Sequence, residues 1–171
     1  MKKRNLFLAL AVAILVGCGA EAKVQTANPW TTMEKADLEK QTGYKLNVPE
    51  GADDIEYSYL ESENLAQVSF KLNNADWVYR VQATNELEDI SGMYYDWEIN
   101  EAGHVGDYEA QFMAYAESSE ETEFIDDIFA VHVVNWYNVD EGTTHSLSAS
   151  GKDLNGMDIQ VYAEQLQQGG M

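Results

Sequence analysis

Residues 66–83 read AQVSFKLNNADWVYRVQA, with apolar residues at every second position on each side of Asn73-Asn74. A period of two is typical of a β-strand with one buried face. Asparagine tolerates the positive φ angles that a two-residue hairpin turn requires. With Asn73-Asn74 as the loop, Phe70 lies opposite Trp77 on one side of the hairpin. The same rule pairs Val68 with Tyr79 and Ala66 with Val81, so pattern and turn predict one register.

Further strands are expected on both sides of this hairpin because alternation recurs along the chain. They are predicted around residues 44–48, 55–59, 94–99, 108–116, 128–137 and 145–149. The run from Ile128 to Tyr137 is apolar on both faces, as in a central strand that is covered on each side. Residues 86–106 otherwise read as a loop with room for a helical turn.

Two helices are predicted, one near each end of the folded part. Thr31-Thr32-Met33-Glu34 matches a capping box, so a helix of about ten residues should follow it and stop at Gly43. Asp153 or Asn155 is expected to cap a second helix. Its apolar residues recur at helical spacing: Ile159, Tyr162, Ala163 and Leu166.

These elements predict the α+β class. Sequential strands with short loops favour an antiparallel meander sheet of about six to seven strands, with one N-terminal and one C-terminal helix. At 171 residues, one domain is expected. The predicted divisions are a signal peptide (1–17), a lipidated cysteine and flexible tether (18–28), a single domain (29–168) and a disordered tail (169–171).

The first 20 residues have the layout of a secretory signal. A positive head, Met1–Arg4, precedes an apolar run from Leu6 to Val16, which is shorter than the ~20 residues of a membrane-spanning helix. Leu15-Val16-Gly17-Cys18 resembles the lipobox of bacterial lipoproteins. The resemblance implies cleavage before Cys18, acylation of its thiol and an extracytoplasmic domain anchored in a bacterial cell membrane; we favour a Gram-positive, single-membrane envelope. An ordinary signal peptide with an incidental cysteine is the alternative.

The chain is strongly acidic. Without residues 1–17, 154 residues remain (171 − 17), with 7 Lys and Arg against 30 Asp and Glu, a net charge of about −23. Such a surface repels nucleic acid and anionic lipid, so neither is expected as a partner beyond the lipid on Cys18 itself. It attracts cations or basic peptides. The alternative is that the acidity serves solubility alone.

Residues from Asn28 onward also resemble a domain family of unknown function found in Gram-positive lipoproteins and in the extracytoplasmic regions of anti-sigma-factor-like proteins. The shared features are Asn28-Pro29-Trp30, Thr42-Gly43-Tyr44, Val48-Pro49 and Asp89-Ile90-Ser91-Gly92. The family supplies no catalytic residue. The resemblance implies a regulatory or sensor role that acts through a membrane partner.

Catalytic and metal-binding patterns are weak in this sequence. His104, His132 and His145 lack the close spacing of a metal site, and His132 reads as a structural histidine in an apolar strand. The nearest candidate for a nucleophilic serine, Ser91-Gly92, reads as a turn. We therefore expect a non-enzymatic protein with no cofactor and no metal.

Aromatic residues provide the candidate ligand-binding set. If several of Tyr94, Tyr95, Trp97, Trp136 and Tyr137 stay exposed together, they form a surface for a peptide or glycan; otherwise they close the ends of the core. Arg80 is expected to neutralise carboxylates on neighbouring strands, and its guanidinium is a candidate clamp for an anionic ligand.

The leading hypothesis is a lipid-anchored binding or interaction module, whose partner is an envelope protein, a peptide or a glycan. The regulatory or sensor role is the first alternative. An envelope hydrolase is the second, and it requires a cleft in which polar and titrating groups converge.

Overall fold

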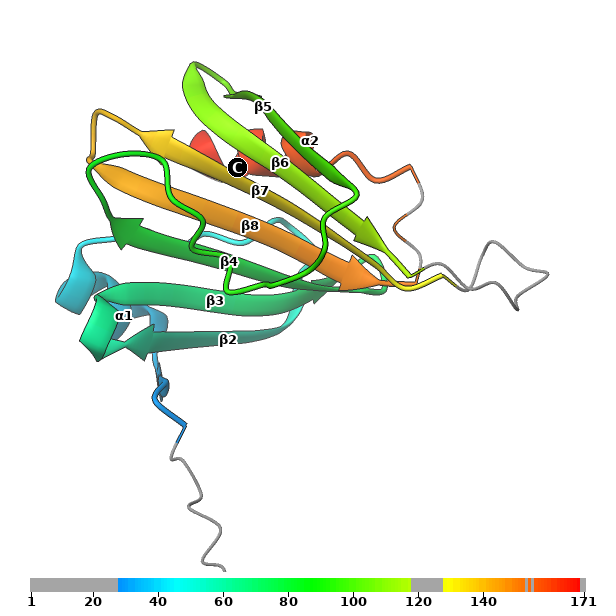
Figure 1. Cartoon of the computed structure of the whole chain (residues 1–171). Helices are drawn as coiled ribbons and strands as arrows, with labels where there is room; N and C mark the ends of the chain where they lie inside the picture. The colour runs from blue at the N-terminus through cyan, green and yellow to red at the C-terminus, as the bar shows by residue number, and fades with distance from the viewer. Residues whose placement is uncertain (1–27, 118–127, 153, 155, 170–171) are drawn as a thin grey trace, which may run out of the picture.

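The computed structural model of the chain describes residues 28–117, 128–152, 154 and 156–169. In these ranges one eight-stranded sheet, ordered β1-β2-β3-β4-β8-β7-β6-β5, is accompanied by two α-helices (Figure 1). The elements are β1 (Thr31–Met33), α1 (Lys35–Thr42), β2 (Asp53–Leu60), a 3-10 turn (Glu61–Glu63), β3 (Leu65–Leu72), β4 (Ala75–Ala83), β5 (Ile99–Val105), β6 (Tyr108–Ala116), β7 (Ala130–Asn138), β8 (Thr143–Gly151) and α2 (Ile159–Gln167). An antiparallel sheet with two helices was predicted, but the expected six to seven strands were too few.

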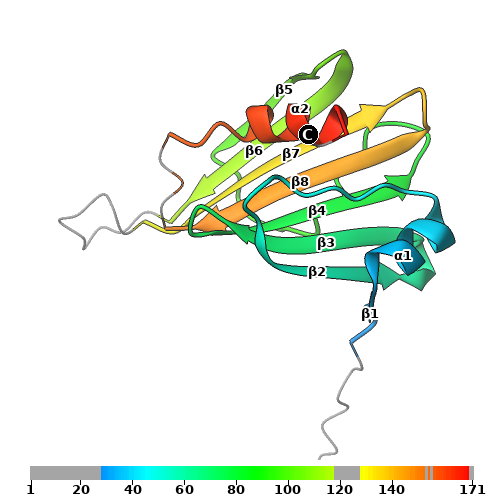
Figure 2. The same ribbon diagram turned by 180° about the vertical axis from the view of Figure 1, so that it is seen from behind.

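The sheet consists of two antiparallel meanders rather than one. The first meander, β1–β4, and the second, β5–β8, meet where β4 pairs with β8. Residues 84–98 connect them by crossing one face of the sheet, which we call the loop face (Figure 1). Helix α2 and residues 43–52 lie on the opposite, helical face (Figure 2). Both faces of the central strands are therefore covered, as predicted for β7.

The predicted hairpin is confirmed in turn and in register. Asn73 and Asn74 have φ angles of 52° and 61°, the signs that a type I′ turn requires. Phe70 lies opposite Trp77, and the other predicted pairs follow the same register. Turn chemistry and burial pattern select the same alignment, because a slip by one residue would expose the whole apolar face.

The N-terminal predictions need two corrections. Thr31–Met33 is not a helical cap but strand β1, paired with β2, and α1 begins after Glu34. Pairing with β2 fixes Thr31 in extended backbone and thereby overrides the local capping pattern. Gly43 ends the helix with a φ of 80°, as expected. Residues 44–48 do not form the predicted strand; they cross the helical face, where Leu46 is fully buried.

The region before β6 also differs from expectation. No strand forms over residues 94–98, and β5 occupies Ile99–Val105, where a loop was predicted. β5 is an edge strand that is largely exposed, so its sequence lacks apolar alternation. Its conformation is fixed by pairing with β6 across the tight turn at Gly106-Asp107.

Helix α2 is present, but its cap is Asp158, whose Oδ1 accepts a hydrogen bond from the Gln160 amide at 3.1 Å. The expected caps, Asp153 and Asn155, lie outside the described residues. Ile159, Ala163 and Leu166 are buried, as their spacing predicted. No helix in the described ranges has the length and apolarity needed to cross a membrane. Cys18 and the acidic stretch 118–127 also lie outside those ranges.

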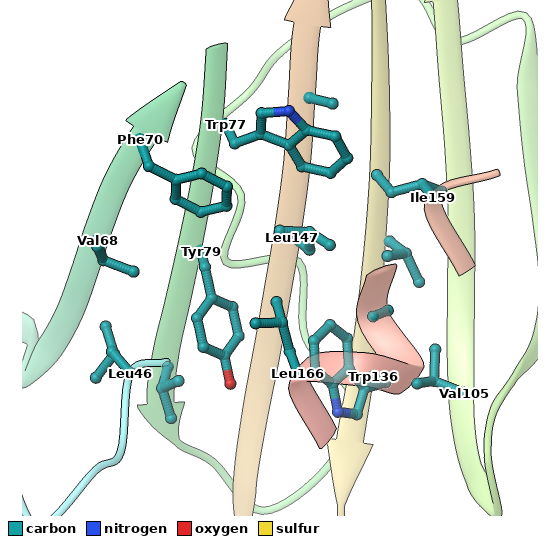
Figure 3. Packing of buried hydrophobic residues seen from close by; sticks show 14 of the residues in the cluster. Leu46, Val68, Phe70, Trp77, Tyr79, Val105, Trp136, Leu147, Ile159 and Leu166 are labelled. Atoms are coloured by element: carbon teal, nitrogen blue, oxygen red, sulfur yellow. The ribbon is translucent and has the colours of Figure 1, made fainter. Parts of the chain in front are cut away.

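One core unites the two meanders on the helical face. Phe70 and Trp77 stack in the first meander with ring centroids 6.0 Å apart. The rings of Trp77 and of Tyr162 in α2 also pack together, with centroids 4.7 Å apart. Figure 3 shows Phe70 and Trp77 on the same face as Trp136 of the second meander. Burying each large apolar side chain contributes about 1.5–3 kcal/mol, so this shared cluster is the main stabilising feature.

Candidate functional site

A cavity of about 600 Å³, here called the polar-aromatic pocket, opens on the helical face. Its rim comes from three connections: the end of α1 with the residues after it, the turn between β7 and β8, and the C-terminal end of α2. Strands β4, β7 and β8 form its floor. The lining residues are Thr42, Gly43, Tyr44, Lys45, Asn47, Tyr79, Val81, Trp136, Asn138, Glu141, Thr143, His145, Leu166, Gln167, Gln168 and Gly169.

Three stacked rings make up the floor. The centroids of Trp136 and His145 are 5.0 Å apart with an interplanar angle of 12°, and Tyr79 lies 6.0 Å from each of them. All three side chains belong to the helical face. Trp136 pairs with His145, and Tyr79 pairs with Leu147, which lies two residues from His145 on the same side of β8. Cross-strand register thus brings together residues that lie up to 66 positions apart in the sequence.

A chain of hydrogen bonds fixes the imidazole within this stack. His145 Nδ1 shares a hydrogen bond of 2.8 Å with Tyr79 Oη, and His145 Nε2 shares one of 2.9 Å with Thr143 Oγ1. Burial lowers the pKa of His145 to about 4. Burial also raises the pKa of Tyr79, and the charge of Glu141 adds to that shift. At neutral pH the floor is therefore uncharged, and each ring nitrogen has a hydroxyl partner.

This geometry favours recognition over nucleophilic chemistry. Thr143 provides the aliphatic hydroxyl that is hydrogen-bonded to the imidazole, but only 4% of this residue is exposed. A general base works best with a pKa near the operating pH, and the pKa of His145 is far below it. The floor is a neutral, almost fully buried layer whose two hydroxyl groups are hydrogen-bonded to His145.

The rim is rich in uncharged hydrogen-bonding groups. It contains amide side chains from Asn47, Asn138, Gln167 and Gln168, but one lysine and one glutamate. In a chain with 30 acidic residues, such a lining departs from the general composition. Asn47 Nδ2 donates to the Gly169 carbonyl at 3.1 Å and so joins two sides of the rim.

A second cavity of about 360 Å³ shares Leu166 and Gln168 with the pocket. It lies between residues 48–50, the β3–β4 turn and α2. At this turn Asn73 Nδ2 donates to Tyr162 Oη at 3.2 Å. The two cavities together follow the gap between residues 43–50 and α2.

The predicted aromatic set is divided between the two faces of the sheet. Trp136 lines the pocket floor and is 1% exposed. Tyr95 and Trp97 lie together on the loop side, where Tyr95 also stacks on Tyr115 at 4.7 Å. Tyr94 beside them is 94% exposed. Tyr137 lies near the C-terminal end of β7, where it pairs with Thr144. Tyr115 pairs with Val131 at the N-terminal end of β7, so Tyr137 is remote from the Tyr95 cluster.

Arg80 has a different role from the one expected. Its cross-strand neighbours, Gln67 and Ser146, are neutral rather than acidic. Arg80 Nε donates to Gln67 Oε1 at 2.8 Å, and Nη1 donates to the carbonyls of Ile90 and Ser91 at 3.1 and 2.6 Å. The guanidinium also lies 5.3 Å from the Trp30 ring. Burial lowers the pKa of Arg80, and the charges of Tyr94, Asp89 and Glu63 oppose that shift.

Arg80 is part of a row of polar side chains across the loop face. Successive neighbours on five strands are Gln67, Arg80, Ser146, Asn135 and Gln111. Asn135 is fully buried, and its Nδ2 donates to Asp89 Oδ1 at 3.1 Å. Polar contacts of this kind act together with two apolar clusters to hold residues 84–98 against the sheet. Ile90 packs with Leu60 and Leu65, and Met93 and Trp97 pack against Met113, Val131 and Val133.

The histidines do not meet. His132 is half-buried on the helical face, where burial lowers its pKa, and His104 is exposed on β5. Among the described residues, no three His, Cys, Asp or Glu side chains gather in a group suited to a metal ion.

Sequence reasoning missed Tyr79, Thr143 and His145 as a unit. A weak signal existed, since His145 alternates with Leu147 and Ala149 and so lies on the buried face of its strand. No protein-family model, curated protein or solved structure matches the chain.

Proposed function

We propose that this chain is a lipid-anchored, extracytoplasmic, non-enzymatic binding domain of a bacterium, and that its ligand occupies the polar-aromatic pocket. The observation that carries the proposal is the pocket itself: a cavity of about 600 Å³ over a preorganised, uncharged floor. Concave sites with a few fixed polar groups are the usual places for small ligands.

The proposed location rests on the sequence around Cys18. A positive head, a short apolar run and the tetrapeptide Leu15-Val16-Gly17-Cys18 precede the folded domain. Two or more acyl chains provide stable membrane attachment, because each buried methylene contributes about 0.8 kcal/mol.

The chemistry of the pocket indicates a small, uncharged ligand with several hydrogen-bonding groups, such as a sugar or a short peptide. Four amide side chains on the rim can both donate and accept. The stacked floor cannot offer a charge at neutral pH, because the imidazole of His145 is neutral there. The lining holds one charged side chain of each sign, Lys45 and Glu141, so it has no excess charge to offset the hydration that a charged ligand would lose.

Anchoring is tested by expressing the full chain in a bacterium with labelled fatty acid. We expect label and membrane association in the unchanged chain and neither in Cys18→Ser. Mass spectrometry should find the N-terminus at residue 18 with an acyl mass. An unmodified precursor, or equal membrane association of both proteins, would contradict the anchoring proposal.

Ligand binding is tested by NMR titration of the exported protein with neutral mono- and disaccharides and with capped dipeptides. A ligand should shift the Trp136 indole and the amides of the rim. Gln168→Trp, on the exposed part of the rim, should abolish these shifts by filling the pocket. Val161→Trp, at an exposed position of the same helix that does not line the pocket, is the matched control. Shifts confined to other surfaces, or no shift with either panel, would contradict the proposal.

A further inference from the structure

Strand β5 leaves one edge of the sheet open along seven residues. It is last in the strand order, and five of its residues (Ile99, Asn100, Glu101, Ala102 and His104) are exposed. The opposite edge strand, β1, has only three residues and leads directly into α1. β5 contains neither lysine nor proline, two residue types with which proteins protect sheet edges.

The turn at Gly106-Asp107 determines which backbone groups point outward. Val105 and Tyr108 flank this two-residue loop and are paired. Flanking residues of such a hairpin exchange both hydrogen bonds, and bonded and non-bonded pairs then alternate along the ladder. The N–H and C=O groups of Asn100, Ala102 and His104 therefore point away from β6, toward any additional strand.

Gly103 adds no side chain to this edge. A Cβ atom at this position would lie 2.8 Å from the Phe112 ring, so Phe112 occupies the space that a side chain would take. The ring covers the glycine from the helical face, and Gly103 itself presents no side chain to an added strand. Side chains of an added strand can thus pack beside β5 without displacing it.

The surroundings of β5 carry one sign of charge. Residues 81–151 contain 16 acidic residues and no lysine or arginine. Four of the acids are exposed on or beside β5: Glu98, Glu101, Asp107 and Glu109. Like charges that are not neutralised locally produce a strong potential, which attracts basic partners and accelerates their association.

The same charge argues against a second copy of this chain at the edge. Pairing two β5 strands would bring the four exposed acids on or beside β5 of one copy close to the same four of the other copy. The negative potential at this edge attracts a basic segment, whereas it repels a second copy of this acidic chain.

We propose that the β5 edge binds an extended, lysine- or arginine-rich segment of a partner protein, which adds to the sheet as a ninth strand. Backbone hydrogen bonds from the three outward-facing residues supply affinity, and the flanking carboxylates select basic side chains. No β5 residue lines the polar-aromatic pocket, so the two sites are separate and can be tested separately.

The test uses the exported protein and a fluorescent seven-residue peptide of alternating Lys and Thr, with a Glu-for-Lys peptide as the charge control. We expect the basic peptide alone to bind and to slow hydrogen exchange at the amides of Asn100, Ala102 and His104. Ala102→Pro removes an outward N–H and should weaken binding at least about tenfold. Ala102→Thr keeps that N–H and should bind within about twofold of the unchanged chain.

Charge is tested with Glu98→Gln/Glu101→Gln, which should weaken binding several-fold and reduce its dependence on salt. Glu56→Gln, an exposed change on β2, should have little effect. Far-ultraviolet circular dichroism of Ala102→Pro checks that the sheet is retained; if it is not, the exchange pattern in the unchanged chain decides. Absence of binding, equal binding of both peptides, protection elsewhere, or a dimer that buries β5 would each overturn the proposal.

Discussion

The two meanders are similar in construction and different in charge. Residues 28–83, which include β1–β4, contain ten acidic residues and five Lys or Arg, whereas residues 84–151, which include β5–β8, contain 16 acidic residues and no Lys or Arg. The ion pairs Lys35–Glu39, at 3.5 Å, and Lys71–Asp54, at 3.4 Å, both lie in the first part. The first meander neutralises part of its negative charge with its own bases, whereas residues 84–151 have no lysine or arginine with which to do so.

The meanders also differ in how they end. The first ends the sheet with β1, which is short and followed by a helix, whereas the second ends it with the long, exposed β5. Between them, β4 and β8 form the seam that carries the pocket floor. A single sheet thus combines a short edge strand linked to a helix, a central cavity and a long, exposed edge strand.

The largest expected effect tests whether the meanders form one folding unit. Trp77→Ala in the first meander and Trp136→Ala in the second should each lower the free energy of unfolding by about 3–5 kcal/mol, because both rings are buried in the shared core. Chemical denaturation followed by fluorescence and by circular dichroism should give one coincident transition in each variant. Two separate transitions would show that the meanders unfold independently.

The seam should make stability depend on pH. The folded state holds the pKa of His145 at about 4, below its ordinary value of about 6.5, so the unfolded chain binds a proton first as the pH falls. The contribution of neutral His145 to the free energy of unfolding is fully present above pH ~6.5. As the pH falls to ~4, the free energy of unfolding should decrease by about 3 kcal/mol.

His145→Gln provides the comparison, because it removes the titrating ring and leaves His132 and the carboxylates in place. The difference in unfolding free energy between the unchanged chain and this variant should shrink between pH 6.5 and 4. A constant difference across this range would contradict the assignment.

The connection between the meanders should be sensitive at Gly92. This residue has a φ of 66°, and a Cβ atom here would collide with Arg80 Nη1. Gly92→Ala should therefore destabilise the protein by about 2 kcal/mol through backbone strain and through displacement of Arg80. Gly156→Ala has a similar φ of 78° but open space around it, so it should cost only about 1 kcal/mol. Equal losses in the two variants would show that Arg80 does not constrain Gly92.

The smallest expected effect compares the two tight turns. Asn74→Gly should stabilise the first meander by a few tenths of a kcal/mol, because glycine adopts a φ near 61° without a steric cost. Gly106→Ala in the second meander should destabilise by about 1 kcal/mol or more, since its φ is 58° and a Cβ atom would contact the Gln167 amide. Thermal unfolding measures both. A loss of stability in Asn74→Gly would mean that the Asn74 side chain contributes more than its turn geometry indicates.

The sequence alone determined the elements in which local and cross-strand preferences agree. Asn73-Asn74 and the alternating runs beside it defined a hairpin to the exact residue pair, and the spacing of Ile159, Ala163 and Leu166 defined the buried side of α2. Patterns of this kind need no distant partner, because burial and backbone conformation are encoded within a few residues.

Only the tertiary structure decided the elements whose environment comes from elsewhere in the chain. β5 is a strand because it pairs with β6, although its polar, glycine-containing sequence resembles a loop. Thr31–Met33 is a strand because β2 is adjacent, and Arg80 binds carbonyl groups because residues 84–98 return over it.

The candidate site belongs wholly to this second class. Tyr79 and His145 are 66 positions apart, and their contact arises when β8 inserts between β4 and β7. The sequence specified which face of each strand is buried, since that depends on a local period of two. The order of strands depends on packing between segments that are distant in the sequence, and no local pattern encodes it. The pocket and the open edge follow from that order.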